Sequence, residues 1–128
     1  MDKDRQRLMG LLDLQKELIC IFGENDYNVF IFGSYITNSY VEGKSDIDIA
    51  IYSDDFKKYL QVSVFIEAYL YKLGVKQDIF YINTSKPAPI YCAALESPVC
   101  LTDYYPDTLK MFYVSCKNIQ IALKEETA

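Results

Sequence analysis

Apolar positions recur at helical spacing along the first part of the chain. Over residues 2–22, leucines and a final phenylalanine return every three or four positions, and Gly23 follows as a natural helix end. The same spacing begins again after Asp54 and Asp55, either of which suits a helix N-cap, and it stops before Gly74. Two long amphipathic helices are therefore expected in the first 74 residues.

Shorter apolar runs between the helices have the character of β-strands. The segment 46–52 alternates strictly, with isoleucines on one face and Asp46, Asp48 and Ala50 on the other. Four strands are expected, over 28–32, 46–52, 77–82 and 99–102. Two further helices are expected, over 87–96 and from Pro106 onward. This order predicts an α/β (α+β) fold, in which helices pack against a short mixed β-sheet.

Length and composition narrow the class of protein. The chain has 128 residues, of which 51% are hydrophobic, so we expect one domain over 1–128 with a core of its own. Thirteen basic residues against eighteen acidic ones argue against a nucleic-acid partner. No run is long and apolar enough to span a membrane and the charged N-terminus has no secretory signal, so a cytoplasmic location is expected.

The residue types that are missing limit the chemistry. The chain has no histidine, and its four cysteines stand far apart, which excludes the usual zinc sites and the His-paired nucleophiles. The cysteines are expected to be reduced thiols, mostly buried. Any reaction here must then use carboxylates, hydroxyls, lysines and a hard metal ion. The basic start of the first helix is expected to be a solvated face; it comprises Lys3, Arg5 and Arg7.

One constellation has the character of a phosphate and metal site. Gly33 and Ser34 end one predicted strand, where a glycine lets the backbone approach a ligand and a hydroxyl can donate to phosphate. Eleven residues later, Asp46 and Asp48 project from one face of the next strand, a costly pair unless a cation compensates it. Asp78 lies in the third, otherwise apolar strand. If that strand is a neighbour of 46–52, three carboxylates meet.

Each of these residues also has an ordinary structural interpretation. Gly33 and Ser34 alone would suit a strand-to-helix turn with the serine as N-cap. Asp46 and Asp48 alone would be charges at a strand entry or edge, and Asp78 could simply begin its strand. The twelve tyrosines would either touch a partner or a base, or half-bury their rings with the hydroxyl in water.

The pattern resembles the nucleotidyltransferase superfamily that includes DNA polymerase beta, whose signature is a GS pair, a spacer of about ten residues and a DxD on a strand. Within this superfamily, the short chain most resembles the minimal nucleotidyltransferase (MNT) domain, which is the antitoxin partner of HEPN-type toxins. The residues that carry the resemblance are Phe32-Gly33-Ser34, the run from Ser45 to Ile51, the third acid Asp78, and the stretch from Pro89 to Leu101 with Asp103.

The resemblance implies a reaction and its participants. AMP would pass from ATP to a hydroxyl, in the family a tyrosine of the cognate HEPN toxin, with which the chain would assemble. Asp46, Asp48 and Asp78 would hold two Mg²⁺ ions, and Asp78 would also orient the acceptor hydroxyl. Gly33 and Ser34 would hold the phosphates of the nucleotide.

The sequence also departs from the family. Where the family often has a small residue, Arg and Gly, this chain has Ile36, Thr37 and Asn38, and Lys44 is a candidate substitute for the arginine. The departure favours one alternative, an antitoxin that neutralises its partner by binding alone. A nucleotidyltransferase for small molecules is a second alternative, although 128 residues leave no room for an acceptor domain. A nucleic-acid polymerase is a third, disfavoured by charge and length.

Overall fold

The computed structural model describes residues 3–127, which contain nine elements of secondary structure. The predicted helix start at Asp2 lies outside the described residues. In chain order these elements are α1 (Lys3–Phe22), β1 (Tyr27–Phe32), the 3₁₀ turn η1 (Gly33–Ile36), β2 (Ile47–Ser53), α2 (Phe56–Lys72), β3 (Gln77–Tyr81), α3 (Ile90–Leu95), β4 (Val99–Cys100) and α4 (Asp107–Thr127). Within the described residues no helix is long and apolar enough to cross a membrane.

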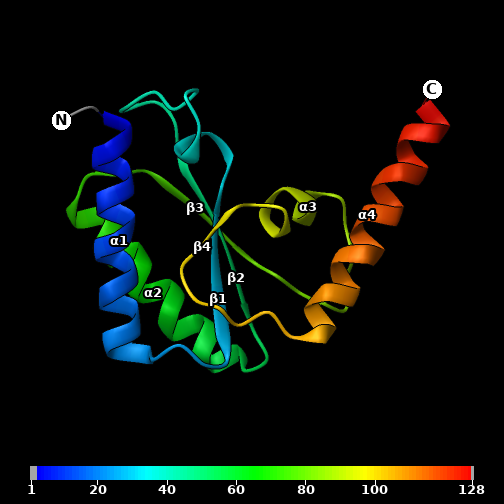
Figure 1. The fold of residues 1–128 in the computed structure, drawn as a ribbon, viewed down its shortest axis with the longest axis horizontal. Coiled ribbons are helices and arrows are strands. Elements are labelled where there is room, and N and C mark those ends of the chain that lie inside the picture. Colours follow the sequence, from blue (N-terminus) through cyan, green and yellow to red (C-terminus); the bar gives the residue numbers. More distant parts are fainter. Residues whose placement is uncertain (1–2, 128) are drawn as a thin grey trace.

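The strands form one mixed sheet in the order β3-β2-β1-β4. β1 is antiparallel to both β2 and β4, whereas β2 and β3 run parallel and are joined by the crossover helix α2. α1 and α2 cover one face of the sheet, and α3 and α4 lie on the other, with the C-terminal half of α4 directed away from the sheet (Figure 1). The predicted fold class, a short mixed sheet with helices packed against it, is confirmed.

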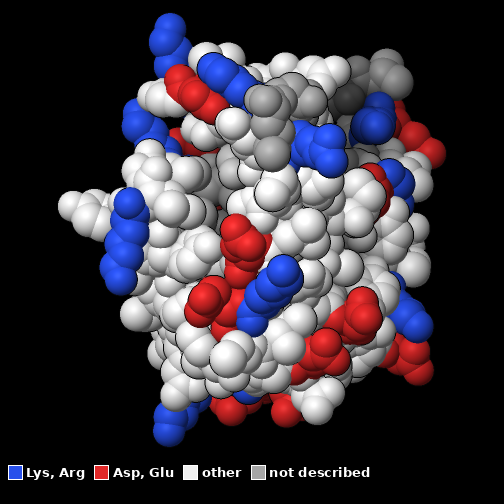
Figure 2. Space-filling model, turned by 60° about the vertical axis from the view of Figure 1, so that its left-hand side comes forward, with Lys and Arg blue, Asp and Glu red and all other residues white. Residues whose placement is uncertain are grey.

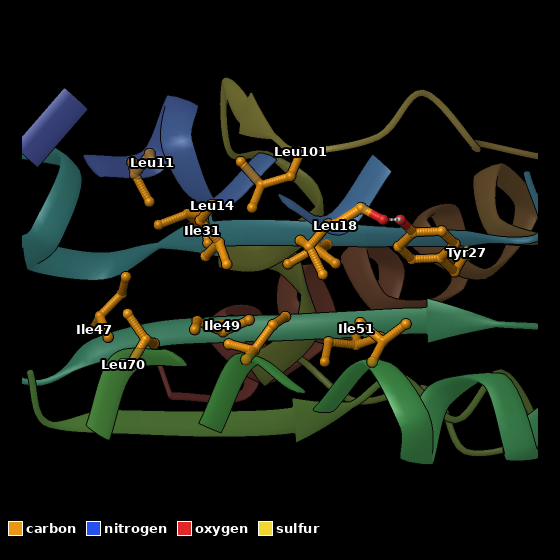
Figure 3. Close-up of a cluster of buried hydrophobic side chains, with 13 residues drawn as sticks. Leu11, Leu14, Leu18, Tyr27, Ile31, Ile47, Ile49, Ile51, Leu70 and Leu101 are labelled. Carbon is orange, nitrogen blue, oxygen red and sulfur yellow. Dashed lines mark hydrogen bonds between the residues drawn. The ribbon is translucent and has the colours of Figure 1, made fainter. Parts of the chain in front are cut away.

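The alternation of β2 divides the core between the two faces. Ile47, Ile49 and Ile51 pack under α1 and α2, in a buried aliphatic layer that includes Leu11, Leu14 and Leu18 of α1 (Figure 3). Ala50 and Tyr52 face the opposite side, with the aromatic and small residues of α3 and α4. Because side chains of a strand alternate, Asp48 belongs to this second face, at the end that the helices leave open.

The structure shifts several predicted boundaries for local reasons. The third helix begins at Ile90 rather than at 87, because the ring of Pro89 disfavours a helical backbone at Ala88, the residue before it. β4 has only two residues, although Leu101 continues the pairing through its N–H to the Val29 carbonyl. Of the two possible caps of α2, Asp55 accepts the N–H of Lys57.

The cysteines are all free, but the expectation that they are mostly buried is wrong for two of them. Cys92 and Cys116 lie in the core under α3 and α4, whereas Cys20 and Cys100 are exposed. Cys20 lies on the solvent side of α1. Cys100 belongs to β4, the edge strand of the sheet, which has a neighbouring strand on one side only.

Candidate nucleotidyl-transfer site

The register of the sheet brings two of the predicted acids together. β2 and β3 pair in parallel with Asp48 directly opposite Asp78, and neighbouring strands lie about 4.8 Å apart. Ile49 and its partner Ile79 both pack toward α1 and α2, so the two carboxylates share the other face. The expected neighbourhood of the second and third strands is therefore correct, and it places Asp78 beside Asp48.

Gly33 closes the same site from the end of β1. Its predecessor Phe32 is paired with Asp48, which brings the Gly33 backbone against the Asp48 carboxylate. A Cβ at Gly33 would overlap Oδ2 of Asp48 and lie 3.1 Å from its Cγ. The φ of Gly33 is +77°, a conformation that L side chains rarely adopt. Glycine is thus required here both by its backbone and by the close approach of a carboxylate.

Asp46 lies just before β2, exposed, and completes a group of three interacting charges. Burial raises the pKa of the Asp48 carboxyl above its ordinary value, and the negative charges of Asp78 and Asp46 raise it further. Asp78 and Asp46 are thus near enough to repel the charge of Asp48 through space. Such repulsion is the electrostatic condition that a bound cation would relieve.

The donor set fits magnesium without forming a finished cage. Among the residues that the structure describes, no three His, Cys, Asp or Glu side chains converge closely enough to hold a metal ion. Magnesium does not require such a cage, because it commonly uses one or two carboxylates and completes its shell with phosphate oxygens and water. Asp48 and Asp78 on adjacent strands, with Asp46 beside them, supply hard oxygen donors of that kind.

Ser34 lies within η1, half-buried, rather than at its cap. The N-cap position belongs to Phe32, which makes no side-chain cap hydrogen bond, so the interpretation of Ser34 as a helix cap is wrong. The Ser34 carbonyl accepts both the N–H and the hydroxyl of Thr37, at 2.9 and 3.0 Å. These two hydrogen bonds close the turn between Ser34 and Thr37.

An apolar floor continues from the acids along the sheet. Phe32 and Phe80 lie on the face of Asp48 and Asp78, with ring centroids 6.0 Å apart. α3 and α4 pack on this same face of the sheet (Figure 1). The site is therefore a cluster of negative charge beside aromatic surface, rather than a hole in the core.

Arg7 contacts the loop that follows the GS pair, and the sequence pattern does not predict this contact. The guanidinium donates from Nε to the Tyr35 carbonyl at 3.0 Å and from Nη2 to the Thr37 carbonyl at 3.2 Å. The interpretation of this part of α1 as a solvated face is therefore wrong for Arg7. The partners are 28 and 30 residues apart in sequence, so local pattern carries no signal for them. Lys44, the candidate substitute in the loop itself, is exposed.

Comparisons with known proteins agree with this geometry. The family model described as a nucleotidyltransferase domain matches residues 13–99, a range that contains β1, β2 and β3, the GS pair and all three acids. The chain therefore belongs to the nucleotidyltransferase domain family. No match is found among curated proteins.

Solved structures share the fold at low sequence identity. A chain of the MntA–HpeT toxin–antitoxin complex, in a mutant with two aspartates replaced by glutamates, matches with a TM-score of 0.56 and 16% identity, over 91% of this chain and 90% of that one. A complex described as a toxin–antitoxin with AMP-PNP matches at 0.52 and 17%, over 98% and 92%. The tri-AMPylated Shewanella oneidensis HEPN toxin in complex with MNT antitoxin matches at 0.50 and 16%, over 96% and 91%.

Proposed function

We propose that this chain is a single-domain, Mg²⁺-dependent adenylyltransferase that moves AMP from ATP to a hydroxyl of a HEPN-type toxin and so acts as its antitoxin. The observation that carries the proposal is the pairing of Asp48 with Asp78 across β2 and β3, with Gly33 against the Asp48 carboxylate. The family assignment supports nucleotidyl transfer as the reaction. The choice of ATP and of a toxin as acceptor is supported by the AMP-PNP and tri-AMPylated complexes among the structural neighbours.

The residues divide the work by position. Asp48 and Asp78 would supply the carboxylates that hold the magnesium, with Asp46 beside them; when bound, the ion neutralises charge on the phosphates and polarises the phosphorus for attack. Without a side chain at Gly33, the backbone at the strand end would be accessible to a phosphate, and the Ser34 hydroxyl would donate to it. Asp46 and Asp78 are exposed, so an acceptor hydroxyl can reach the acids from solvent.

The reaction balances as an in-line displacement. The acceptor hydroxyl oxygen forms a bond to the α-phosphorus while the bond from that phosphorus to the bridging oxygen breaks, and pyrophosphate leaves. Asp78 orients the hydroxyl and accepts its proton, which passes on to water. A carboxylate within hydrogen-bond reach of the hydroxyl can act as this general base.

The proposal is tested by transfer of label from α-labelled ATP to the cognate HEPN-type toxin. Asp46→Asn and Asp48→Asn preserve side-chain size and remove the charge, so each is expected to abolish transfer while thermal melting shows an intact fold. Asp103→Asn, an exposed acid in the loop after β4, is the matched control and should transfer normally. Transfer that persists in both site variants would overturn the assignment of these acids.

A toxin that stays neutralised by both variants would instead favour the second candidate, an antitoxin that acts by binding alone. Thr37 and Asn38, in place of a basic residue in the loop, favour this candidate. A direct measurement separates the two: ATP with Mg²⁺, compared with ATP and EDTA, should raise the melting temperature if the site binds nucleotide. At a hundredfold excess over Kd the stabilisation is about 2.7 kcal/mol. Label passed to a small molecule but not to the toxin would identify the remaining alternative.

A further inference from the structure

The segment after the GS pair is long, irregular and held mainly by its own contacts. Between η1 and β2, ten residues form neither helix nor strand. Thr37 and Ser45 close local turns: Thr37 bonds to Ser34 and Ser39, and the Ser45 hydroxyl accepts the Val41 N–H. These bonds shape the segment internally, but they do not fix its place relative to the sheet.

Arg7 of α1 supplies such an attachment. Its guanidinium donates hydrogen bonds to the carbonyl of Tyr35, in the second half of η1, and to the carbonyl of Thr37, the C-cap of η1. Its guanidinium also lies over two rings of the segment, 5.7 Å from the Tyr35 centroid and 4.9 Å from the Tyr40 centroid. The two rings contact each other edge to face at 4.9 Å. One side chain thus joins the beginning and the middle of the loop to α1.

Arginine is suited to this contact in a way that lysine is not. A planar guanidinium can donate in two directions to fixed carbonyls and stack on aromatic rings at the same time, whereas an ammonium offers a compact charge on a flexible stem. Leu8 and Leu11 of the same helix line a cavity of about 250 Å³ with Arg7, Tyr35 and Ile36. Because of this cavity, side-chain packing alone leaves room for the loop to shift toward α1.

We infer that Arg7 is a positioning residue for nucleotide binding: it holds the loop of residues 33–40 so that Gly33 and Ser34 face the phosphates. The inference rests on the proposed function. At one end the loop is located by Gly33 against Asp48, and three residues beyond Ser34 it is located by Arg7 at Thr37. Arg7 acts through backbone carbonyls rather than on the nucleotide, so its loss weakens nucleotide binding more than the chemical step.

The test compares Arg7→Gln and Arg7→Lys with the control Lys16→Gln, an exposed basic residue of the same helix. In the transfer assay, Arg7→Gln should raise the KM for ATP about tenfold and change kcat by less than about threefold. Arg7→Lys should stay at least about fivefold above the wild-type KM, because it restores the charge but not the two directed donors. Lys16→Gln should match the wild type.

Three results would overturn the inference. One is a wild-type KM in Arg7→Gln. Another is full rescue by Arg7→Lys, which would show that charge alone acts. The third is a loss of melting temperature with unchanged KM, which would show a merely structural contact.

A separate readout distinguishes this inference from the function on which it rests. If the wild-type protein transfers no label and binds no ATP, the proposed function fails. Amide hydrogen exchange of residues 34–40 then still decides the attachment, since Arg7→Gln should speed exchange there by about tenfold or more and leave α2 unchanged. Unchanged exchange in the loop would overturn the attachment irrespective of activity.

Discussion

Two aspartates near opposite ends of β2 have different surroundings. Asp54, just after the strand, accepts hydrogen bonds from the hydroxyls of Tyr52 and Tyr104, whose rings stack with centroids 6.1 Å apart. The hydrogen bond to Asp54 raises the pKa of Tyr104 to about 12. At this end the fold supplies two hydroxyl donors to the carboxylate, and the nearby side chains of Thr102 and Asn28 donate to backbone carbonyls.

Asp48, six residues earlier, meets other carboxylates instead of donors. In the part of the chain that the structure describes, no hydrogen bond is found to its side chain, and its neighbours in space are Asp78 and Asp46. Its pKa is raised by burial first and by these like charges second. The fold therefore accepts an electrostatic cost at one end of the sheet that it avoids at the other.

The difference shows which acids are structural and which are available to a ligand. A carboxylate already bound to two hydroxyls stabilises the fold and has little to offer a cation. Carboxylates brought together without donors destabilise the free protein, and they gain most when a cation arrives. Charge is also spread elsewhere: Figure 2 shows acidic and basic side chains interspersed with uncharged surface on the face that includes α1. Substitutions at the two ends of β2 test this difference.

The largest effect is expected on the chemical step at the site end. Asp78→Asn should lower nucleotide transfer about a hundredfold or more, because the carboxylate touches the acceptor hydroxyl in the proposed reaction. ATP·Mg²⁺ binding should stay within about tenfold, which is about 1.4 kcal/mol. Asp54→Asn is the matched control from the other end and should transfer within about twofold of the wild type. Equal losses in both variants would show that the two ends do not differ in function.

Gly33→Ala should have the next largest effect, on stability. The added Cβ would meet the Asp48 carboxylate, and the alanine would have to adopt a positive φ. We therefore expect the free energy of unfolding in urea to fall by about 2–3 kcal/mol, together with loss of transfer. Gly43→Ala separates the two causes, since Gly43 has the same φ of +77° but nothing within 4 Å of its Cβ. It should cost about 1 kcal/mol. Similar losses at both glycines would contradict the close approach at Gly33.

Tyr104→Phe should cost about 1 kcal/mol at neutral pH, a modest value because the hydrogen bond is exposed, and should leave transfer unchanged. The pH dependence has a definite sign. The folded pKa of Tyr104, about 12, lies above its ordinary value of 10, so this stabilisation is complete below pH 10 and is lost as the pH rises toward 12. Unfolding measured from pH 8 to 11.5 should show this decline in the wild type and less of it in Tyr104→Phe. Tyr71→Phe, an exposed ring, should not alter the decline.

The smallest effect should be a gain. Asp48→Asn removes a charge that is repelled by Asp78 and Asp46, so the ligand-free protein should become more stable at neutral pH by about 0.5 kcal/mol, screened by salt. In the wild type, ATP·Mg²⁺ should raise the melting temperature, and in the variant this rise should shrink or vanish. A variant less stable than the wild type without ligand would mean that Asp48 has a structural partner like that of Asp54.

Sequence reasoning recovered most of the fold because the pattern was strong where burial was complete. The strict alternation in 46–52 predicted both the strand and the shared face of Asp48 and Ala50, since a buried isoleucine layer admits one register only. The parallel neighbourhood of the third strand was stated as a condition, and the structure confirms it. The roles of Gly33, Ser34, Asp46, Asp48 and Asp78 in binding and catalysis remain predictions.

The errors fall where contacts are distant in sequence or polar. The basic start of the first helix predicts a solvated face for Arg7, yet its hydrogen-bond partners lie 28 and 30 residues away. Asp54 was grouped with Asp55 as a helix cap, and only the structure shows that it binds two tyrosines instead. Such contacts leave no periodic signal, because one side chain meets one carbonyl or hydroxyl without repeating along the element.

By itself, the sequence determined the helices, the four strands, the mixed α/β class and the set of chemically capable residues, because each of these follows from local periodicity and residue type. The tertiary structure alone decided that Asp48 stands opposite Asp78, that Gly33 has no room for a side chain, and that Arg7 reaches the loop. These decisions depend on strand order, register and the path of the chain in space. They are set by the simultaneous burial of all elements, which no single segment of the sequence encodes.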